Sequence, residues 1–169
     1  MIDHIGEIPK VASQKFGNRA ALIFKNHTFS FNEINDLVEK LASGLASLGI
    51  KEKEVVTLYA SNSWEWVISY FSIARIGAVI NPVNTMLTPD EINYVVKDCH
   101  AKTIITSSDK ASEILDLKKN GVVNSIISFD NPPKGTIDFN DLIKEKNKNV
   151  QMPKISPKSL STIGYTSGT

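Results

Sequence analysis

Four residues near the end of the 169-residue sequence, Thr166-Ser167-Gly168-Thr169, have the types and spacing of a phosphate-binding turn. Two Thr and one Ser offer hydroxyls, each able to donate and accept hydrogen bonds. Gly168 lets the backbone approach a ligand closely, and successive amide N–H groups in such a turn form an anion-binding concavity. The alternative is an ordinary polar turn, which a run of these residue types also fits.

The residues just before this turn are expected to position it. Leu160–Tyr165 is short, partly apolar and β-prone, because Thr, Ile and Tyr suit a pleated, half-buried surface. This pattern predicts a strand. Ligands of parallel sheets bind at the carboxyl ends of strands, so a polar turn directly after a strand suits a ligand site.

The composition narrows the classes of protein to consider. Hydrophobic residues make up 41% of the chain and charged residues 22%, which is typical of a globular domain. A net charge of +1 gives no electrostatic case for nucleic acid or a membrane surface as the main partner. The sequence has no secretory signal pattern, no apolar run that predicts a transmembrane segment, and a single cysteine, Cys99. These features predict a cytoplasmic protein without disulfides.

The rest of the chain alternates between predicted strands and helices. A helix ending at Gly17 precedes a hairpin of Ala20–Phe24 and Thr28–Phe29, joined by a turn at Lys25–His27. Further strands are predicted at Val55–Tyr59, Ala78–Ile80, Lys102–Thr106 and Ser125–Phe129, and helices at Ser30–Gly49, Asn62–Gly77, Thr88–His100, Lys110–Lys119 and Phe139–Lys146. The pattern predicts an α/β fold: a mainly parallel sheet flanked by helices, with an N-terminal β-hairpin beside it.

Three glutamates lie at positions that helix capping explains without catalysis. Ser30 with Glu33, and Thr88 with Glu91, have the spacing of capping boxes. Asn62 is predicted to cap the helix before Trp64, with Glu65 three residues on. Near the end of the chain, Lys146–Lys158 is rich in Asn, Lys and Pro, and predicts a mobile linker.

Other reactive side chains lack the spacing that chemistry requires. The three histidines have no metal-ligand spacing with Cys99, and Cys99 is interpreted as a small core residue rather than a nucleophile. A cluster of aromatic residues fits either the wall of a pocket or core and interface packing. These histidines and aromatic residues are His4, His27, His100, Trp64, Trp66, Tyr70 and Phe71.

Several segments, taken in order, resemble the adenylate-forming family of acyl-CoA synthetases, peptide-synthetase adenylation domains and luciferases. They are Phe16–Leu22, Ala42–Gly49, Ile76–Asn84, Leu87–Ile92, Asp98, Ala101-Lys102, Ile104-Ile105 and Tyr165–Thr169. The last of these is similar to the opening of the family's phosphate loop, which continues Thr-Gly-x-Pro-Lys-Gly. The spacing around Asn81–Asn84 and Thr88–Glu91 resembles the fatty acyl-CoA synthetase branch.

The resemblance implies a two-step ligase. A carboxylic acid, expected to be a fatty acid, reacts with ATP to give an acyl-adenylate and pyrophosphate, and coenzyme A then displaces AMP. Mg²⁺ and the phosphate loop would neutralise the phosphate charge, with Thr166, Ser167, Gly168 and Thr169 as phosphate-binding residues. No catalytic residue or metal ligand of the family is expected within this chain.

The resemblance further implies that residues 1–169 are the N-terminal portion of the AMP-binding domain, truncated at the start of the phosphate loop, with residues 146–158 as a linker inside it. Such a fragment is expected to be inactive by itself. The alternative is a non-catalytic α/β binding or dimerisation module, and a homodimer is left open.

Overall fold

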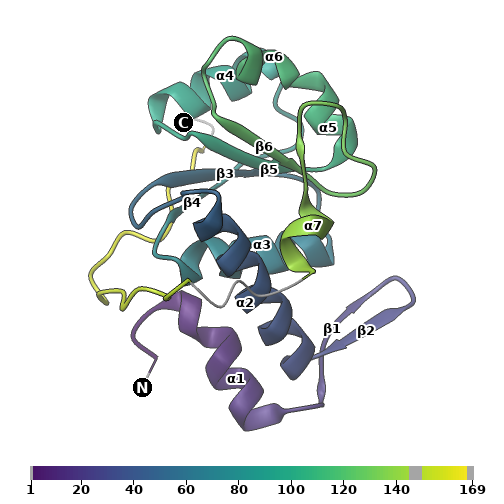
Figure 1. Cartoon of the computed structure of the whole chain (residues 1–169), viewed down its shortest axis with the longest axis vertical. Coiled ribbons are helices and arrows are strands. Elements are labelled where there is room, and N and C mark those ends of the chain that lie inside the picture. Colours follow the sequence, from purple (N-terminus) through teal and green to yellow (C-terminus); the bar gives the residue numbers. More distant parts are fainter. Residues whose placement is uncertain (1, 145–149, 167–169) are drawn as a thin grey trace.

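The computed structural model describes residues 2–144 and 150–166 and contains two sheets (Figure 1). The antiparallel hairpin consists of β1 (Ala20–Phe24) and β2 (His27–Ser30). The second sheet has five parallel strands in the order β4-β3-β5-β6-β7. They are β3 (Val55–Tyr59), β4 (Val79–Pro82), β5 (Thr103–Thr106), β6 (Ser125–Ser128) and β7 (Ile137–Asp138). The predicted α/β fold, with the hairpin apart from the parallel sheet, is confirmed.

Helices cover both faces of the parallel sheet (Figure 1). On one face lie α2 (Phe31–Ser47) and α3 (Trp64–Arg75). On the other lie α4 (Pro89–Asp98), α5 (Ser108–Glu113) and α6 (Leu115–Lys119). The remaining helices are η1 (Ile5–Glu7), α1 (Ile8–Phe16) and α7 (Phe139–Ile143).

The strands are apolar on both faces because both faces are covered, as parallel sheets require. Successive residues of β5 point to opposite sides: Ile105 packs in the core under α2 and α3, and Ile104 in the core under α4 and α6. In β6, Ile127 packs in the same core as Ile105, and Ile126 packs in the same core as Ile104. All four of these side chains are fully buried.

Both predicted capping boxes are confirmed. The Ser30 hydroxyl accepts from the Glu33 amide, while a Glu33 carboxylate oxygen accepts from the Ser30 amide at 2.7 Å. Thr88 and Glu91 make the same reciprocal pair at the start of α4. The helices begin at these positions because the pairs satisfy amides that have no partner within the helix.

The predicted cap of α3 is wrong by one residue. Ser63, not Asn62, has the extended backbone of an N-cap, and its hydroxyl accepts from the Trp66 amide at 3.2 Å. Glu65 therefore lies at the second helical position, one residue short of where a capping box would use it.

Other predictions also differ from the structure, among them the end of β4, which extends to Pro82 rather than stopping at Ile80. The single helix predicted at Lys110–Lys119 is two short helices, because Ile114, with φ −114° and ψ 10°, leaves helical geometry and is buried in the core. His27 belongs to β2 rather than to the turn. The two-residue strand β7 was not predicted, since so short a run has no periodicity to detect.

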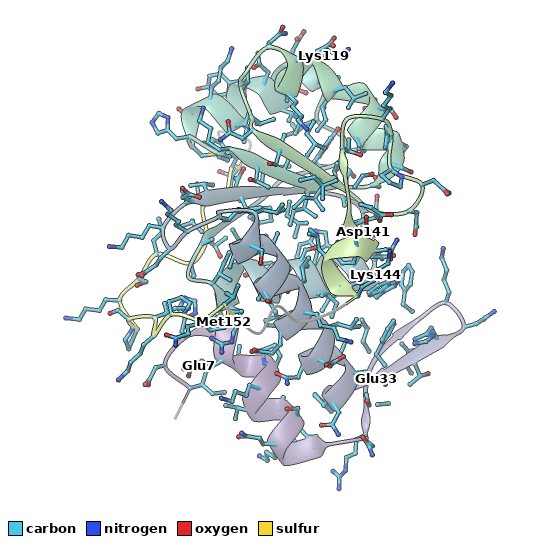
Figure 2. All side chains as sticks on the ribbon, viewed as in Figure 1. Glu7, Glu33, Lys119, Asp141, Lys144 and Met152 are labelled. Atoms are coloured by element: carbon cyan, nitrogen blue, oxygen red, sulfur yellow. The ribbon has the colours of Figure 1, made fainter. Side chains whose placement is uncertain are left out.

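The linker prediction covers Lys146–Lys158, of which residues 146–149 lie outside the described residues. Val150–Lys158 contains no helix or strand, and Met152 packs against the core (Figure 2). The mobility of this segment stays a prediction.

Candidate phosphate-binding site

The strand order defines where a ligand site is expected. The chain passes from β3 outward to β4 and then returns across β3 to β5, so the connections diverge between β3 and β5. Doubly wound sheets bind ligands at the carboxyl ends of strands at such a switch point. Two pockets lie at this edge, of about 270 and 490 Å³, and both include the loop residues Ala60–Asn62 that follow β3.

The segment that leads into Thr166 runs along the outer edge of β4. The Ile80 amide donates to the Ser161 carbonyl at 2.8 Å, and the Ile163 amide donates to the Ile80 carbonyl at 2.9 Å. Thr162 thereby forms a single parallel bridge with Ile80. The predicted strand at Leu160–Tyr165 is reduced to this bridge.

Pro82 explains why the pairing stops. In a parallel ladder the next donor along β4 would be the amide of residue 82, and proline has no N–H. The Asn81 side chain supplies the missing donor: its Nδ2 donates to the Ile163 carbonyl at 3.0 Å. A side chain therefore continues the connection that the backbone cannot make.

Asn81 is fully buried and links three parts of the fold. Its Oδ1 accepts from the Thr57 hydroxyl of β3 at 3.0 Å and lies 3.7 Å from the Cys99 sulfur, at the end of α4. Thr57, Asn81 and Ile163 thus form a hydrogen-bonded chain from the middle of the sheet to the candidate loop. Such a buried network holds its members in one arrangement when its polar groups are satisfied.

Tyr165 makes a second attachment. Its Oη donates to Asp98 Oδ2 at 2.5 Å, over the C-terminal end of α4. Desolvation and this hydrogen bond to a carboxylate raise the pKa of the Tyr165 phenol, because both favour its neutral form. The Tyr165 side chain is held at the residue directly before the predicted phosphate-binding turn.

Of the four predicted phosphate-binding residues, the structure describes Thr166, which is exposed. Ser167, Gly168 and Thr169 lie outside the described residues, so their role stays a prediction. Sequence reasoning assigned no role to Asn81. A usable signal was present, since an amide side chain between Ile80 and Pro82 in an apolar run is unusual for a buried strand.

The other reactive residues have structural roles. His4 is buried, its Nδ1 accepts from the Gly6 amide at 3.1 Å, and desolvation lowers its pKa. Cys99 is buried in the core, as interpreted. Trp64 packs edge-on against Phe139 and also lines a groove beside the hairpin, so its packing and pocket-lining interpretations both apply.

Within the described ranges, no group of three or more His, Cys, Asp or Glu side chains could hold a metal ion. Over the same residues, no helix is long and apolar enough to cross a membrane.

The fold and this edge define an α/β domain with a candidate ligand site at the carboxyl ends of a parallel sheet. Residues 10–169 match the family model described as "AMP-binding enzyme". The chain belongs to this family.

Its relatives include acid–CoA ligases. The 4-coumarate:CoA ligase 1 of Petunia hybrida is 29% identical over 92% of this chain and 29% of its own length. A mitochondrial medium-chain acyl-CoA ligase of Mus musculus is 26% identical over 98% of this chain and 31% of its own length. The crystal structure of an anthranilate CoA ligase with anthranoyl-AMP superposes with a TM-score of 0.89 and 25% identity, over 98% of this chain and 32% of that one. This chain therefore spans less than a third of the length of each.

Proposed function

We propose that this chain is the N-terminal part of a longer polypeptide that ligates a carboxylic acid to coenzyme A at the expense of ATP. A carboxylate oxygen attacks the α-phosphorus of ATP, the bond to the β-phosphate breaks, and pyrophosphate leaves. The sulfur of coenzyme A then attacks the acyl carbon and AMP leaves. The family match over residues 10–169 is the observation that carries this proposal.

Thr166 is proposed to contact the ATP phosphates, together with Ser167, Gly168 and Thr169. Hydroxyl and amide donors are the groups that phosphate oxygens accept from, so these residue types fit the ligand. The attachments of Ile163 and Tyr165 support this role, because they hold the backbone that leads to Thr166. A donor that is already in place loses less entropy when the ligand binds.

Mg²⁺, when bound with ATP, would neutralise charge on the phosphates. We propose that the acid is a fatty acid, on the resemblance around Asn81–Asn84 and Thr88–Glu91. The names of the relatives also include aromatic acids, so the acid must be tested across both classes. The cytoplasm is the proposed location, and the free thiol of Cys99 suits that reducing compartment.

The test compares pyrophosphate release by this chain and by the longer polypeptide. Both receive ATP, Mg²⁺ and an acid from a panel that runs from acetate to palmitate and includes 4-coumarate and indoleacetate. We expect release by the longer polypeptide with a fatty acid, followed by AMP and thioester when coenzyme A is added, and no turnover by this chain alone.

Three outcomes would contradict parts of the proposal. Robust turnover by the 169-residue chain would show that it needs no further residues. A preference for aromatic acids would overturn the fatty-acid assignment. A folded longer polypeptide that is silent on every acid would favour a non-catalytic binding or dimerisation module.

A further inference from the structure

A polar pocket of about 270 Å³ lies between the loops that follow β3, β5 and β6. Its described lining includes Ser61–Ser63 after β3 and Ser107–Asp109 after β5. The residues that anchor Thr166, namely Asn81, Asp98 and Ile163, are not among its described lining. The proposed phosphate contacts therefore leave this pocket unexplained.

Glu65 lines the pocket and is buried, with 8% of its surface exposed. Its carboxylate forms no hydrogen bond or ion pair with any part of the chain that the structure describes. A glutamate in the first turn of a helix can be explained by the helix dipole alone, and in that case the side chain usually remains in water. The Glu65 oxygens are not among the described atoms that are both fully buried and without a partner, so they face the pocket and can accept from a ligand there. A charge-assisted hydrogen bond from a cation to this carboxylate would be stronger than one from a neutral donor.

The charges around the pocket favour a cation as that partner. Asp109 and Asp130 also line it, and Lys25 is the one basic residue among the described lining. The Lys25 ammonium lies 5.3 Å from the centroid of the Phe24 ring and forms no ion pair with the described carboxylates. Asp109 and Asp130 are exposed, and the Ser107 hydroxyl lowers the pKa of the Asp109 carboxyl. Glu65 is therefore the unengaged buried acid of the pocket.

Two other ligand classes fit less well. An anion would meet three carboxylates, and the Ser63 hydroxyl at the start of α3 already accepts from Trp66. A metal ion would need a set of ligands that the described side chains do not form. A planar or compact cation with several N–H donors could bond both Glu65 and the surrounding serine and asparagine oxygens.

We propose that this pocket binds a guanidinium or ammonium group, with the Glu65 carboxylate as its acceptor. The group could belong to a small molecule or to an Arg or Lys side chain of the longer polypeptide. Both sources present the same donors to Glu65. The proposal does not depend on the ligase activity.

The first test is an NMR titration of the ¹⁵N-labelled chain with methylguanidinium, with tetramethylammonium as a cation that has no N–H donor. We expect saturable shifts at the amides of residues 61–65 and 107–109 with methylguanidinium only. Glu65→Gln should weaken binding about tenfold or more, as loss of a charge-assisted hydrogen bond implies. The matched variant Glu7→Gln changes an exposed glutamate of η1 outside the pocket and should bind as the parent does (Figure 2).

A second measurement does not depend on whether Glu65→Gln folds. Carbodiimide amidation of carboxylates in the unaltered chain, read by mass spectrometry, should label Glu65, and methylguanidinium should protect it. In the longer polypeptide, Glu65 could resist carbodiimide labelling without any added cation, and methylguanidinium could fail to bind. This result would assign the cationic group to an adjoining side chain. Labelling that methylguanidinium prevents would assign it to a small molecule.

Three results would overturn the proposal. They are an absence of saturable shifts, equal shifts with tetramethylammonium, and Glu65 labelling that methylguanidinium leaves unchanged in both polypeptides.

Discussion

The Tyr165 phenol donates a hydrogen bond to the Asp98 carboxylate at 2.5 Å, joining residues that lie 67 positions apart in the sequence. Asp98 is the last residue of α4, and Tyr165 directly precedes Thr166. The bond therefore ties the end of a helix on one face of the sheet to the entrance of the proposed phosphate-binding turn. This attachment and the Asn81–Ile163 bond hold consecutive parts of the same segment.

Removal of the Asp98 carboxylate should lower the pKa of Tyr165. The hydrogen bond to Asp98 favours the neutral phenol, so Asp98→Asn should move the pKa back toward that of an ordinary tyrosine. The measurement is an NMR titration of the tyrosine ring carbons, with Tyr165→Phe used to assign the signal. An unchanged Tyr165 titration in Asp98→Asn would show that the bond does not form in solution.

The same pair predicts how stability changes in alkali. A phenol whose pKa is raised by folding stabilises the native state below the unfolded pKa of about 10. This contribution is lost as pH rises above that value. The free energy of unfolding in urea should therefore fall less steeply above about pH 10 in Tyr165→Phe than in the parent chain. An identical dependence of this free energy on pH in the two chains would contradict the prediction.

Asn81 should be more important for stability than an exposed asparagine. Asn81→Leu leaves the Thr57 hydroxyl and the Ile163 carbonyl without their partner, which should cost about 1–3 kcal/mol per unsatisfied buried group. Asn84→Leu is the matched control, because the Asn84 side chain accepts from the Met86 amide in an exposed turn. Equal midpoints for the two variants in urea unfolding would refute the role assigned to Asn81.

The two capping boxes predict an acid-dependent loss of stability. Backbone hydrogen bonds from Ser30 and Thr88 lower the pKa values of Glu33 and Glu91. Their charged forms stabilise the native state above the unfolded pKa, and this effect is lost as pH falls through the lower folded pKa. The deficit of a Glu33→Gln, Glu91→Gln double variant should be largest near neutral pH and shrink in acid. Urea unfolding midpoints measured from acid to neutral pH test this prediction, with Glu7→Gln as control. A loss of stability in the double variant that is the same at every pH would contradict it.

Gly6 lies against α3 with no space for a side chain. A Cβ at this position would lie 2.7 Å from backbone atoms of Ala74 and Arg75. Gly6→Ala should therefore destabilise the chain by about 1–3 kcal/mol through overpacking. Gly164→Ala should change stability by less than about 0.5 kcal/mol, since no described atom beyond the two adjoining residues lies within 4 Å of the added atom. Similar melting temperatures for the two variants would be inconsistent with this packing.

The proposed phosphate contact of Thr166 can be tested in the longer polypeptide. Thr166→Ala should slow pyrophosphate release by ~10²–10³, the usual cost of one donor to transition-state charge. Thr28→Ala, an exposed threonine of β2, should leave the rate unchanged. Circular dichroism should show both variants folded, and full activity in Thr166→Ala would remove this residue from the site.

The amino-acid sequence by itself determined the features that depend on neighbours a few residues apart. Ser30 and Glu33, like Thr88 and Glu91, are three positions apart, so their capping boxes could be predicted from spacing alone. The alternation of apolar strands with amphipathic helices likewise predicted a parallel α/β sheet and a separate hairpin. The cap of α3 was predicted at Asn62, but the structure has it at Ser63. Both residue types can cap a helix, and spacing alone does not show which of the two has the extended backbone.

Tertiary structure alone decided the arrangement of the candidate sites. Asn81 bonds a carbonyl 82 residues away, and it does so because Pro82 cannot extend the ladder. Glu65 resembles a capping residue in the sequence, and only the meeting of the loops after β3, β5 and β6 makes it a buried acid in a pocket. Local spacing contains no information on which distant groups meet, since these contacts depend on the order in which strands pair and on the packing that follows.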